Sequence, residues 1–532
     1  MTVCRRNIAA VARVARGVAL LLCSSALLCW LVSTAAAQQL SVIIQVKPEL
    51  PGRAIIEGSC AANRIWSFRN SNAGVSELGI RIEQMEVSDA AGLEIAVRKI
   101  APGQFESASP ASRFRYQINL NPPGVSSEAA RVSWLNKERG LLMLADLLPV
   151  FQSQAPASGT NNGSRGNSST SSESRVAVKL DLPEGWSVYS NESQNALGQF
   201  VVTDADSAVF AIGNRLRSSR TAISGMTLSF VSDGDWAFTD GEGLELAGKV
   251  LKAHHEVIGS MPSKQAMLIL FPFPQNAAAS KWSAETRGST VTLLMGRLPS
   301  KVAALAQLST PLTHELFHFW VPNALALDGD YDWFYEGFTI YQAARAAVRL
   351  NLLTFQEFLN AMGRAYDAYA SGVDRDRWSL IEASKRRWTV GESVVYQKSM
   401  LIAFLYDLKL RSESHGKHSL DDVYRDIFRQ SRSLGGNAGD GGSLRGRGSD
   451  GNDAAISALV RASGMQDFAQ AFIQHAVTID LRAELDPFGL RVERLVLRTH
   501  VSVNESLTRP QRDLLRELGY NDYMRSSTQK RR

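Results

Sequence analysis

Cysteine is scarce in this chain, because only four of its 532 residues are cysteines. Cys4, Cys23 and Cys29 all lie within the first 37 residues, which leaves Cys60 as the one cysteine of the remaining sequence. A single cysteine cannot form an intramolecular disulfide. If the first segment is absent from the mature protein, a disulfide framework is therefore excluded.

The first 37 residues also contain no apolar run long enough to cross a bilayer comfortably. The run from Val18 to Val32 is short for a membrane span, and Ala35 to Ala37 precede Gln38 in a small-residue cleavage pattern. Four arginines give the segment a positive start: Arg5, Arg6, Arg13 and Arg16. We predict a signal peptide over residues 1–37 and an exported protein, periplasmic or secreted. An uncleaved anchor is the alternative, and the arginine pair leaves the twin-arginine export route open.

Excess charge of either sign is small once that segment is set aside. Removing residues 1–37 takes away four arginines and no acidic residue, so the formal net charge falls from +6 to +2. The basic balance of the whole chain therefore gives no reason to expect nucleic acid as a partner. We also expect no stable membrane span after signal removal, and the sequence leaves the oligomeric state open.

The composition is that of a globular protein, with 45% hydrophobic and 21% charged residues, and the length favours two or three domains. Residues 38–237 contain many segments with strand patterning, among them SVIIQVKP, FRYQINLNP and RVAVKLDLP. They predict an N-terminal domain built as an antiparallel β-sandwich or saddle. The small and polar residues of 152–175 predict a mobile, low-complexity loop within it.

Helical periodicity dominates the rest of the chain. Residues 238–433 combine helical segments with two strands, QAMLILFPFP and STVTLLMG, and they predict an α+β domain. The glycine-rich tract of 434–453 predicts a flexible loop, and 454–532 predict a mostly helical C-terminal region. The fold class predicted for the whole chain is α+β multidomain.

The segment LTHELFHFW carries two histidines four residues apart and a glutamate beside the first. On a helix, His314 and His318 share one face, so both imidazoles can hold the same cation. Glu315 would then reach the water beside that cation. This pattern is typical of a metallohydrolase.

Zinc in a hydrolytic site takes three protein ligands and keeps an open position. Glu336, in YDWFYEGFTIY, can supply the third ligand, because a carboxylate among aromatic residues is costly to bury without a cation. We therefore predict one Zn²⁺ per chain, bound by His314, His318 and Glu336. Thr310 and Pro311 have the pattern of an N-cap and a first-turn proline, which places the motif in the first two turns of its helix.

A second histidine pair, His254 and His255, lies in a predicted helix. Adjacent residues on a helix point about 100° apart, so the pair is a poor chelate. We predict a packing or surface role for it.

Longer stretches of the sequence resemble a known peptidase family. HELFHFWVPN followed by WFYEGFTIY resembles the motifs of the glycyl aminopeptidase family of gluzincin zinc peptidases and, more distantly, those of aminopeptidase N and leukotriene hydrolase relatives. WSAETRGSTVTLLM is similar to a strand of that family, and VVYQKSMLIAFLYDLKLR to its Y-x-K-G-A helix. The resemblance runs roughly from Leu40 to Arg494. It implies a thermolysin-like α+β zinc catalytic domain over residues 238–433.

The resemblance also implies an activity and further site residues. It implies a zinc-dependent metallopeptidase, an aminopeptidase that acts on peptide substrates with a zinc-activated water and Glu315 as general base. Tyr396 matches the residue that helps to hold the oxyanion, and Glu285 the residue that meets the free amine of the substrate. Two alternatives stay open: an endopeptidase on the same fold, and a catalytically inactive envelope binding protein.

Several positions depart from the family pattern. Ser283, Thr286 and Ser399 stand where the family prefers Gly, His and Gly. The first two lie on the strand expected to line the substrate cleft, so they bear on amino-terminal specificity. Ile340, one turn after the third predicted ligand, replaces the usual carboxylate that supports the ligands. The polar group that supports the metal ligands must therefore come from another residue, and the hydroxyl of Thr339 is the candidate.

Overall fold

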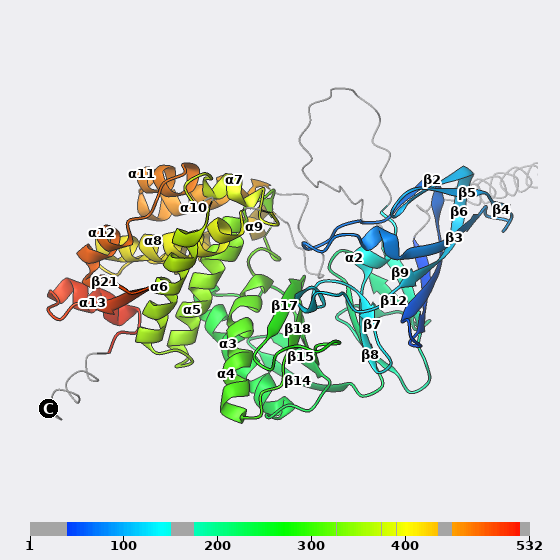
Figure 1. The fold of residues 1–532 in the computed structure, drawn as a ribbon, viewed down its shortest axis with the longest axis horizontal. Coiled ribbons are helices and arrows are strands. Elements are labelled where there is room, and N and C mark those ends of the chain that lie inside the picture. The colour runs from blue at the N-terminus through cyan, green and yellow to red at the C-terminus, as the bar shows by residue number, and fades with distance from the viewer. Residues whose placement is uncertain are drawn as a thin grey trace, which may run out of the picture.

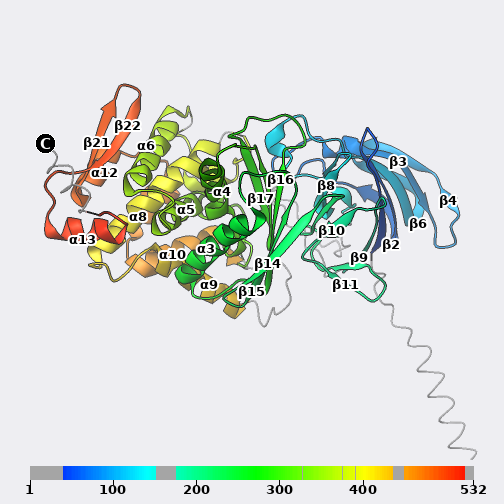
Figure 2. The ribbon, with the colours of Figure 1, turned by 90° about the horizontal axis from the view of Figure 1, so that it is seen from below.

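The structure is a computed structural model that describes residues 40–150, 175–325, 327–373, 375–389, 391–434 and 449–521. The predicted signal peptide and residues 152–174 and 435–448 of the two low-complexity tracts lie outside these residues. A helical part and a β part lie side by side along the long axis of the molecule (Figure 1). Seen from below, the β part consists of successive sheets that lead away from the helices (Figure 2). The chain is thus a mixed α and β protein of several parts, as predicted.

The first sheet has nine strands, in the order β11-β12-β9-β1-β2-β6-β3-β4, with β5 paired to β6. Alternation of apolar and polar residues explains why these segments form half-buried strands, since Val42, Ile44 and Val46 of β1 all point into the core. An antiparallel sheet was predicted, but one pair, β1 with β9, is parallel. The strands are β1 (Ser41–Lys47), β2 (Arg53–Ser67), β3 (Ile82–Ser88), β4 (Glu94–Ile95), β5 (Val97–Ala101), β6 (Gln104–Asn119), β9 (Val176–Asp181), β11 (Ser193–Gln194) and β12 (Phe200–Val202).

A four-stranded sheet with the order β10-β13-β8-β7 packs against the first one. Leu142, Phe210 and Ile212 of this sheet share one apolar core with Val42 and Ile56 of the nine-stranded sheet. Its strands are β7 (Trp134–Leu135), β8 (Arg139–Met143), β10 (Ser187–Tyr189) and β13 (Val209–Gly213). Short helical turns accompany the two sheets: η1 (Leu78–Arg81), η2 (Ser126–Glu128) and α2 (Leu144–Leu147).

The third sheet has five strands in the order β14-β15-β16-β18-β17. The strands are β14 (Arg217–Ile223), β15 (Met226–Ser232), β16 (Gln265–Pro272), β17 (Trp282–Arg287) and β18 (Thr290–Met295). β16 is buried along almost its whole length because it lies centrally and is covered on both faces. The predicted domain boundary at residue 237 falls between β15 and β16, which pair directly, so this sheet begins ahead of that boundary.

One face of the five-stranded sheet meets the four-stranded sheet. Met267, Ile269 and Phe271 of β16 share a core with Trp134 and Leu141. Helices α3 (Asp240–Ile258) and α4 (Lys301–Glu315) cover the other face. The layers therefore follow one another from the helices through three sheets (Figure 2).

The helical part holds the largest apolar core. Its first half consists of η3 (Phe317–Phe319), η4 (Trp333–Phe338), α5 (Thr339–Arg349), α6 (Phe355–Ser371), α7 (Leu380–Ser384), η5 (Val394–Lys398) and α8 (Ser399–Glu413). A capping box of Thr354 and Glu357 starts α6. α8 continues directly from η5 and is buried nearly all round, which explains its apolar sequence.

The remaining elements complete this part, and α12, α13 and β21 lie at its end remote from the sheets (Figure 1). The remaining elements are α9 (Leu420–Leu434), α10 (Gly451–Ser463), α11 (Gln466–Ala469), η6 (Gln470–Gln474), α12 (Leu481–Leu485), η7 (Asp486–Phe488), α13 (Arg509–Glu517), the pair β19 (Leu327–Asp328) and β20 (Ser449–Asp450), and the hairpin β21 (Leu490–Leu495) and β22 (Arg498–Val503). None of the helices in the described ranges is both long enough and apolar enough to span a membrane.

Candidate metal centre and catalytic cleft

Helix α4 carries the first histidine and the glutamate of the motif in its last turn. The helix begins at the N-cap Ser300, whose hydroxyl accepts a hydrogen bond from the backbone N–H of Ala303. Pro311 lies inside the helix, and the hydroxyl of Thr310 donates back to the carbonyl of Ala306 at 3.4 Å. The predicted start at Thr310 is therefore wrong, because the earlier serine caps the helix and the proline is tolerated within it. His314 is consequently at the helix C-terminus.

His318 follows in the short turn η3, where the helix tightens. Its Nδ1 lies 2.8 Å from the carbonyl oxygen of Val321. A carbonyl can only accept, so Nδ1 carries a proton, and Nε2 is the ring nitrogen left to bind a cation. Nε2 lies 3.0 Å from His314 Nε2.

Glu336 comes from the π-helical segment η4, which crosses the segment η5 at very close range. A Cβ atom at Gly337 would collide with the side chain of Ser399 and the carbonyl of Val395. Only glycine allows this approach. The crossing brings the carboxylate of Glu336 and the phenol of Tyr396 into the same region.

The three predicted metal ligands lie together. Glu336 Oε2 is 3.3 Å from His314 Nε2 and 3.6 Å from His318 Nε2. Four ligands at about 2.1 Å around a tetrahedral zinc stand roughly 3.4 Å apart, so these separations fit the ion. Within the described ranges, this is the one group of three His, Cys, Asp or Glu side chains whose ligand atoms converge in this way.

The electrostatics of the cluster also favour a cation. Burial alone would lower the pKa of His318, but the Glu336 carboxylate outweighs it and raises the pKa to about 9. Burial likewise works to raise the pKa of Glu336, yet Arg387 and His318 hold it well below its usual value. The ionised carboxylate therefore draws positive charge to the histidines, and a zinc ion would take the place of the proton that His318 Nε2 holds in its absence. Two imidazoles and a carboxylate are a donor set that zinc prefers.

Arg387 is a site residue that the sequence analysis missed. Its Nη2 lies 2.8 Å from Glu336 Oε1, and its Nη1 lies 2.8 Å from Asp332 and 3.1 Å from the hydroxyl of Tyr335. The hydroxyl of Thr339 makes no hydrogen bond, so the prediction that it supports the metal ligands is wrong. Arg387 supports Glu336 instead. The basic run around Arg387 has the pattern of a solvated loop, and no sequence signal marks the contact.

Glu315 is buried beside the ligands, with 7% of its surface exposed. The hydroxyl of Thr286 donates to its Oε2 at 2.7 Å and to its backbone carbonyl at 3.1 Å, which fixes the carboxylate against β17. Thr286, one of the departures from the family pattern, thus holds the predicted general base. Ser283, the other departure on this strand, donates to the carbonyl of Ser127 at 2.6 Å and ties the strand to its neighbouring loop.

Glu285 neighbours Thr286 on β17 and is partly exposed. Burial raises its pKa, while Arg287 acts to lower it and Glu315 adds to the rise. The closest cation contact is Arg287 Nη2 at 3.9 Å, and that guanidinium also donates to the carbonyl of Arg131 at 2.9 Å. The carboxylate is therefore only loosely paired.

Tyr396 lies half-buried on η5. Burial and the charge of Glu336 raise the pKa of its phenol, against the opposing effect of Arg387. The guanidinium carbon of Arg387 is 5.3 Å from the centre of the ring. The hydroxyl therefore stays protonated at neutral pH and can donate a hydrogen bond.

His254 has the predicted packing role. It is fully buried, and its Nε2 lies 2.9 Å from the carbonyl of Thr313, the residue before the first ligand. Its ring also packs on Phe317 and Trp320. Burial lowers its pKa to about 3, so the ring is neutral and supports the end of α4.

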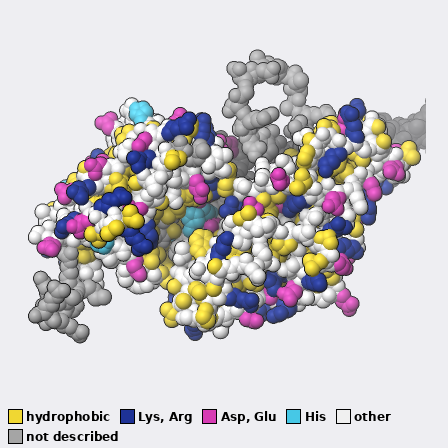
Figure 3. Space-filling view, in the orientation of Figure 1, with side chains coloured by type: hydrophobic (Ala, Val, Ile, Leu, Met, Phe, Trp, Pro, Cys, Tyr) yellow, Lys and Arg dark blue, Asp and Glu magenta, His cyan; other side chains and the backbone are white. Residues whose placement is uncertain are grey.

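A hollow runs between the helical part and the β part, and histidine atoms are exposed within it (Figure 3). His314 is the most exposed of the three ligands, with 17% of its side chain accessible. Trp388 bridges the two parts, because its ring fits against Gly74 and lies 5.7 Å from the guanidinium of Arg131. The cluster is thus reached from a cleft between the parts.

Comparison with protein-family profiles and with curated proteins gives no match. Solved structures do match. An aminopeptidase N family protein from Idiomarina loihiensis is similar to this chain with a TM-score of 0.68 and 17% identity, over 86% of this chain and 79% of that one. An M1 zinc metallopeptidase from Deinococcus radiodurans has a TM-score of 0.49 and 13% identity, over 84% and 95% of the two chains. The first likeness shows that the chain has the fold of the aminopeptidase N family protein.

Proposed function

We propose that this chain is a zinc-dependent metallopeptidase, and an aminopeptidase in particular. The observation that carries the proposal is the convergence of His314, His318 and Glu336 at separations that fit a tetrahedral zinc. The fold shared with an aminopeptidase N family protein supports it. The predicted signal peptide supports a location in the periplasm or outside the cell, where short peptides would be the substrates.

Each side chain of the cleft has a chemical role in this proposal. Zinc, when bound, would lower the pKa of a water and polarise the scissile carbonyl. Glu315 accepts the proton of the attacking water and passes it to the leaving nitrogen, while Thr286 keeps its carboxylate in place. Tyr396 donates a hydrogen bond to the oxyanion of the tetrahedral intermediate. Arg387 holds Glu336 in orientation through the oxygen that faces away from the imidazoles.

Metal analysis tests the proposal directly. The purified chain should contain about one zinc per molecule and hydrolyse amino-acyl arylamides. Dialysis against a chelator should abolish the activity, and addition of zinc should restore it. A folded preparation that binds no zinc would contradict the proposal and favour an inactive envelope binding protein.

Replacement of Tyr396 by Phe should lower kcat about a hundredfold and leave KM nearly unchanged, because the hydroxyl acts on a charge that exists only in the transition state. The measurement is steady-state kinetics on the same arylamide. Tyr335→Phe provides the matched control, since this phenol also contacts Arg387 but bonds to Asp332. An equal loss in both variants would assign Tyr396 a structural role.

An endopeptidase is the second candidate, and the pairing of Glu285 with Arg287 favours it. An anchor for a substrate ammonium needs a free negative charge, and Arg287 at 3.9 Å neutralises part of it. If the chain is an aminopeptidase, acetyl-blocked peptides should resist cleavage, and Glu285→Gln should raise KM for free peptides about tenfold or more. Cleavage of blocked and free peptides at equal rates would establish the endopeptidase instead.

A further inference from the structure

The hairpin of β21 and β22 ends in an apolar tip. Leu495 pairs with Arg498, so the turn consists of the two residues Val496 and Leu497. Val496 is 91% exposed, Leu497 is 79% exposed and Leu495 is 55% exposed. Three consecutive apolar side chains therefore project into solvent from the end of a strand pair, at the end of the molecule remote from the β sheets (Figure 2).

The turn has a residue type that disfavours the backbone conformation it adopts there. Val496 has a φ of 57°, and among the described residues it is the only β-branched one with a positive φ. A two-residue hairpin turn normally takes Gly, Asn or Asp at such a position, because a β-branched side chain is strained there. The two-residue turn between β14 and β15 also has a positive φ at its first position, but a small polar residue, Ser224, occupies it and Gly225 follows. Local stability thus does not account for valine and leucine at the tip.

Arginines flank the tip on both strands. Arg494 precedes Leu495 on β21, and Arg498 opens β22 on the opposite side of the turn. Neither arginine has an ion-pair partner among the carboxylates of the described chain, and both are exposed. Two unpaired positive charges therefore stand beside three exposed apolar side chains.

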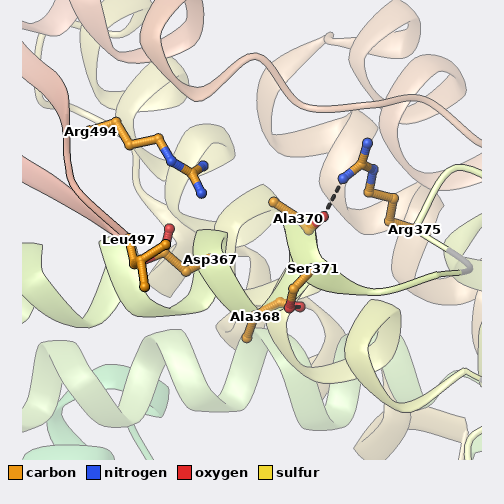
Figure 4. A pocket seen from close by; sticks show the side chains of 7 residues that line it. All are labelled: Asp367, Ala368, Ala370, Ser371, Arg375, Arg494 and Leu497. Carbon is orange, nitrogen blue, oxygen red and sulfur yellow. Dashed lines mark hydrogen bonds between the residues drawn. The ribbon is translucent and has the colours of Figure 1, made fainter.

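A hollow lies at the base of the tip, between the hairpin and the end of α6. Its volume is about 480 Å³, and Arg494 and Arg375 extend into it from opposite sides (Figure 4). Ser371 and Leu497 also line it, as does Asp367, whose carboxylate accepts from Thr499. Arg375 is paired with Asp376 at 3.1 Å, so Arg494 is the arginine of this hollow that is left to contact an anionic group.

We propose that this tip docks on an anionic lipid bilayer. Val496 and Leu497 would enter the boundary between headgroups and acyl chains, while Arg494 and Arg498 contact the phosphates. Charge complementarity and the strained apolar turn together favour a membrane surface over a purely protein partner. The proposal is independent of the peptidase activity, because the tip contributes no residue to the zinc cluster.

Flotation with lipid vesicles tests the proposal. The protein is the chain from Gln38 onward, which contains every described residue and lacks the apolar run of the predicted signal. It should bind vesicles of phosphatidylcholine mixed with phosphatidylglycerol and not vesicles of phosphatidylcholine alone. Removing Arg494 or Arg498 should weaken binding roughly fivefold each, and added salt should weaken it further.

A double variant separates the tip from the rest of the surface. Val496→Gly with Leu497→Asn places glycine at the positive-φ position and a polar residue beside it, so the thermal midpoint should stay equal or rise while vesicle binding falls at least about tenfold. Leu197→Asn is the matched control, because Leu197 is 79% exposed in another hairpin turn and should not affect binding. Absence of binding to both vesicle types, or binding that the double variant leaves intact, would overturn the proposal. So would a dimer that the double variant dissociates without any lipid binding.

Discussion

Replacement of Glu315 by Gln is expected to lower kcat/KM about a thousandfold, the middle of the range for loss of a general acid or base. The amide has the shape of the carboxylate and can still accept the hydroxyl of Thr286, so the fold should persist. It cannot accept a proton from water at neutral pH. Zinc content should stay at that of the parent, because the proposed ligands, His314, His318 and Glu336, are unchanged. The measurement combines steady-state kinetics on an amino-acyl arylamide with metal analysis of the same sample.

Thr286→Val is the matched control for this variant. Valine has nearly the shape of threonine and removes only the hydrogen bond that holds Glu315, so activity should fall about tenfold and not a thousandfold. The Glu315 carboxylate is still present to accept the proton, so the loss of activity should come from its poorer orientation. Equal activity of Glu315→Gln and the parent would contradict the proposed mechanism, and zinc loss from Glu315→Gln would show that the effect is structural.

The sequence predicted the chemistry of the cluster better than its scaffold. His314 and His318 are local, since spacing along one segment is enough to bring both rings to one ion. Glu336 was predictable because a carboxylate among aromatic residues requires a cation. The start of α4 was not, because Thr310 and Pro311 form a valid start signal that Ser300, ten residues earlier, overrides in the folded chain.

Two π-helical segments explain why geometry could not be read from periodicity. Glu336 lies on η4 and Tyr396 on η5, and both segments continue directly into ordinary helices. A π-helix adds one residue to a turn, so it shifts every later side chain around the axis relative to a regular helix. The crossing at Gly337 depends on residues from both segments. Such contacts arise from tertiary packing and leave no local pattern in either sequence.

The same limit applies to Arg387 and to the sheets. Arg387 lies in a basic stretch that is polar enough to be solvated, yet its side chain is largely buried, with only 13% exposed. It bonds to carboxylates more than fifty residues earlier in the chain. The predicted strand segments SVIIQVKP and RVAVKLDLP form β1 and β9, but the parallel pairing of these two strands joins residues that are far apart in the chain. Element types thus follow from the sequence more readily than their neighbours do.

Replacement of Glu336 by Gln is expected to remove the zinc and to lower the stability of the fold. The variant has lost one of three ligands, so metal analysis should find far less than one zinc per chain. It also leaves Arg387 without one of its two carboxylate partners in a site where 13% of the arginine side chain is exposed. Breaking a buried ion pair in this way costs about 3–5 kcal/mol in the free energy of unfolding. Urea unfolding of the metal-free proteins measures that cost without the contribution of bound zinc.

Two further variants separate the ligand role of Glu336 from its ion pair. Asp332→Asn removes the other carboxylate partner of Arg387 and keeps all three ligands, so it should destabilise the protein while zinc binding persists. Adding Arg387→Met and Asp332→Asn together to Glu336→Gln removes the arginine and its remaining carboxylate partner, so stability should recover and zinc should not return. Recovery of zinc in this triple variant, or full zinc content in Glu336→Gln alone, would contradict Glu336 as a ligand. A stability loss that the triple variant fails to reverse would show that Glu336 acts on the fold through contacts other than this charged group.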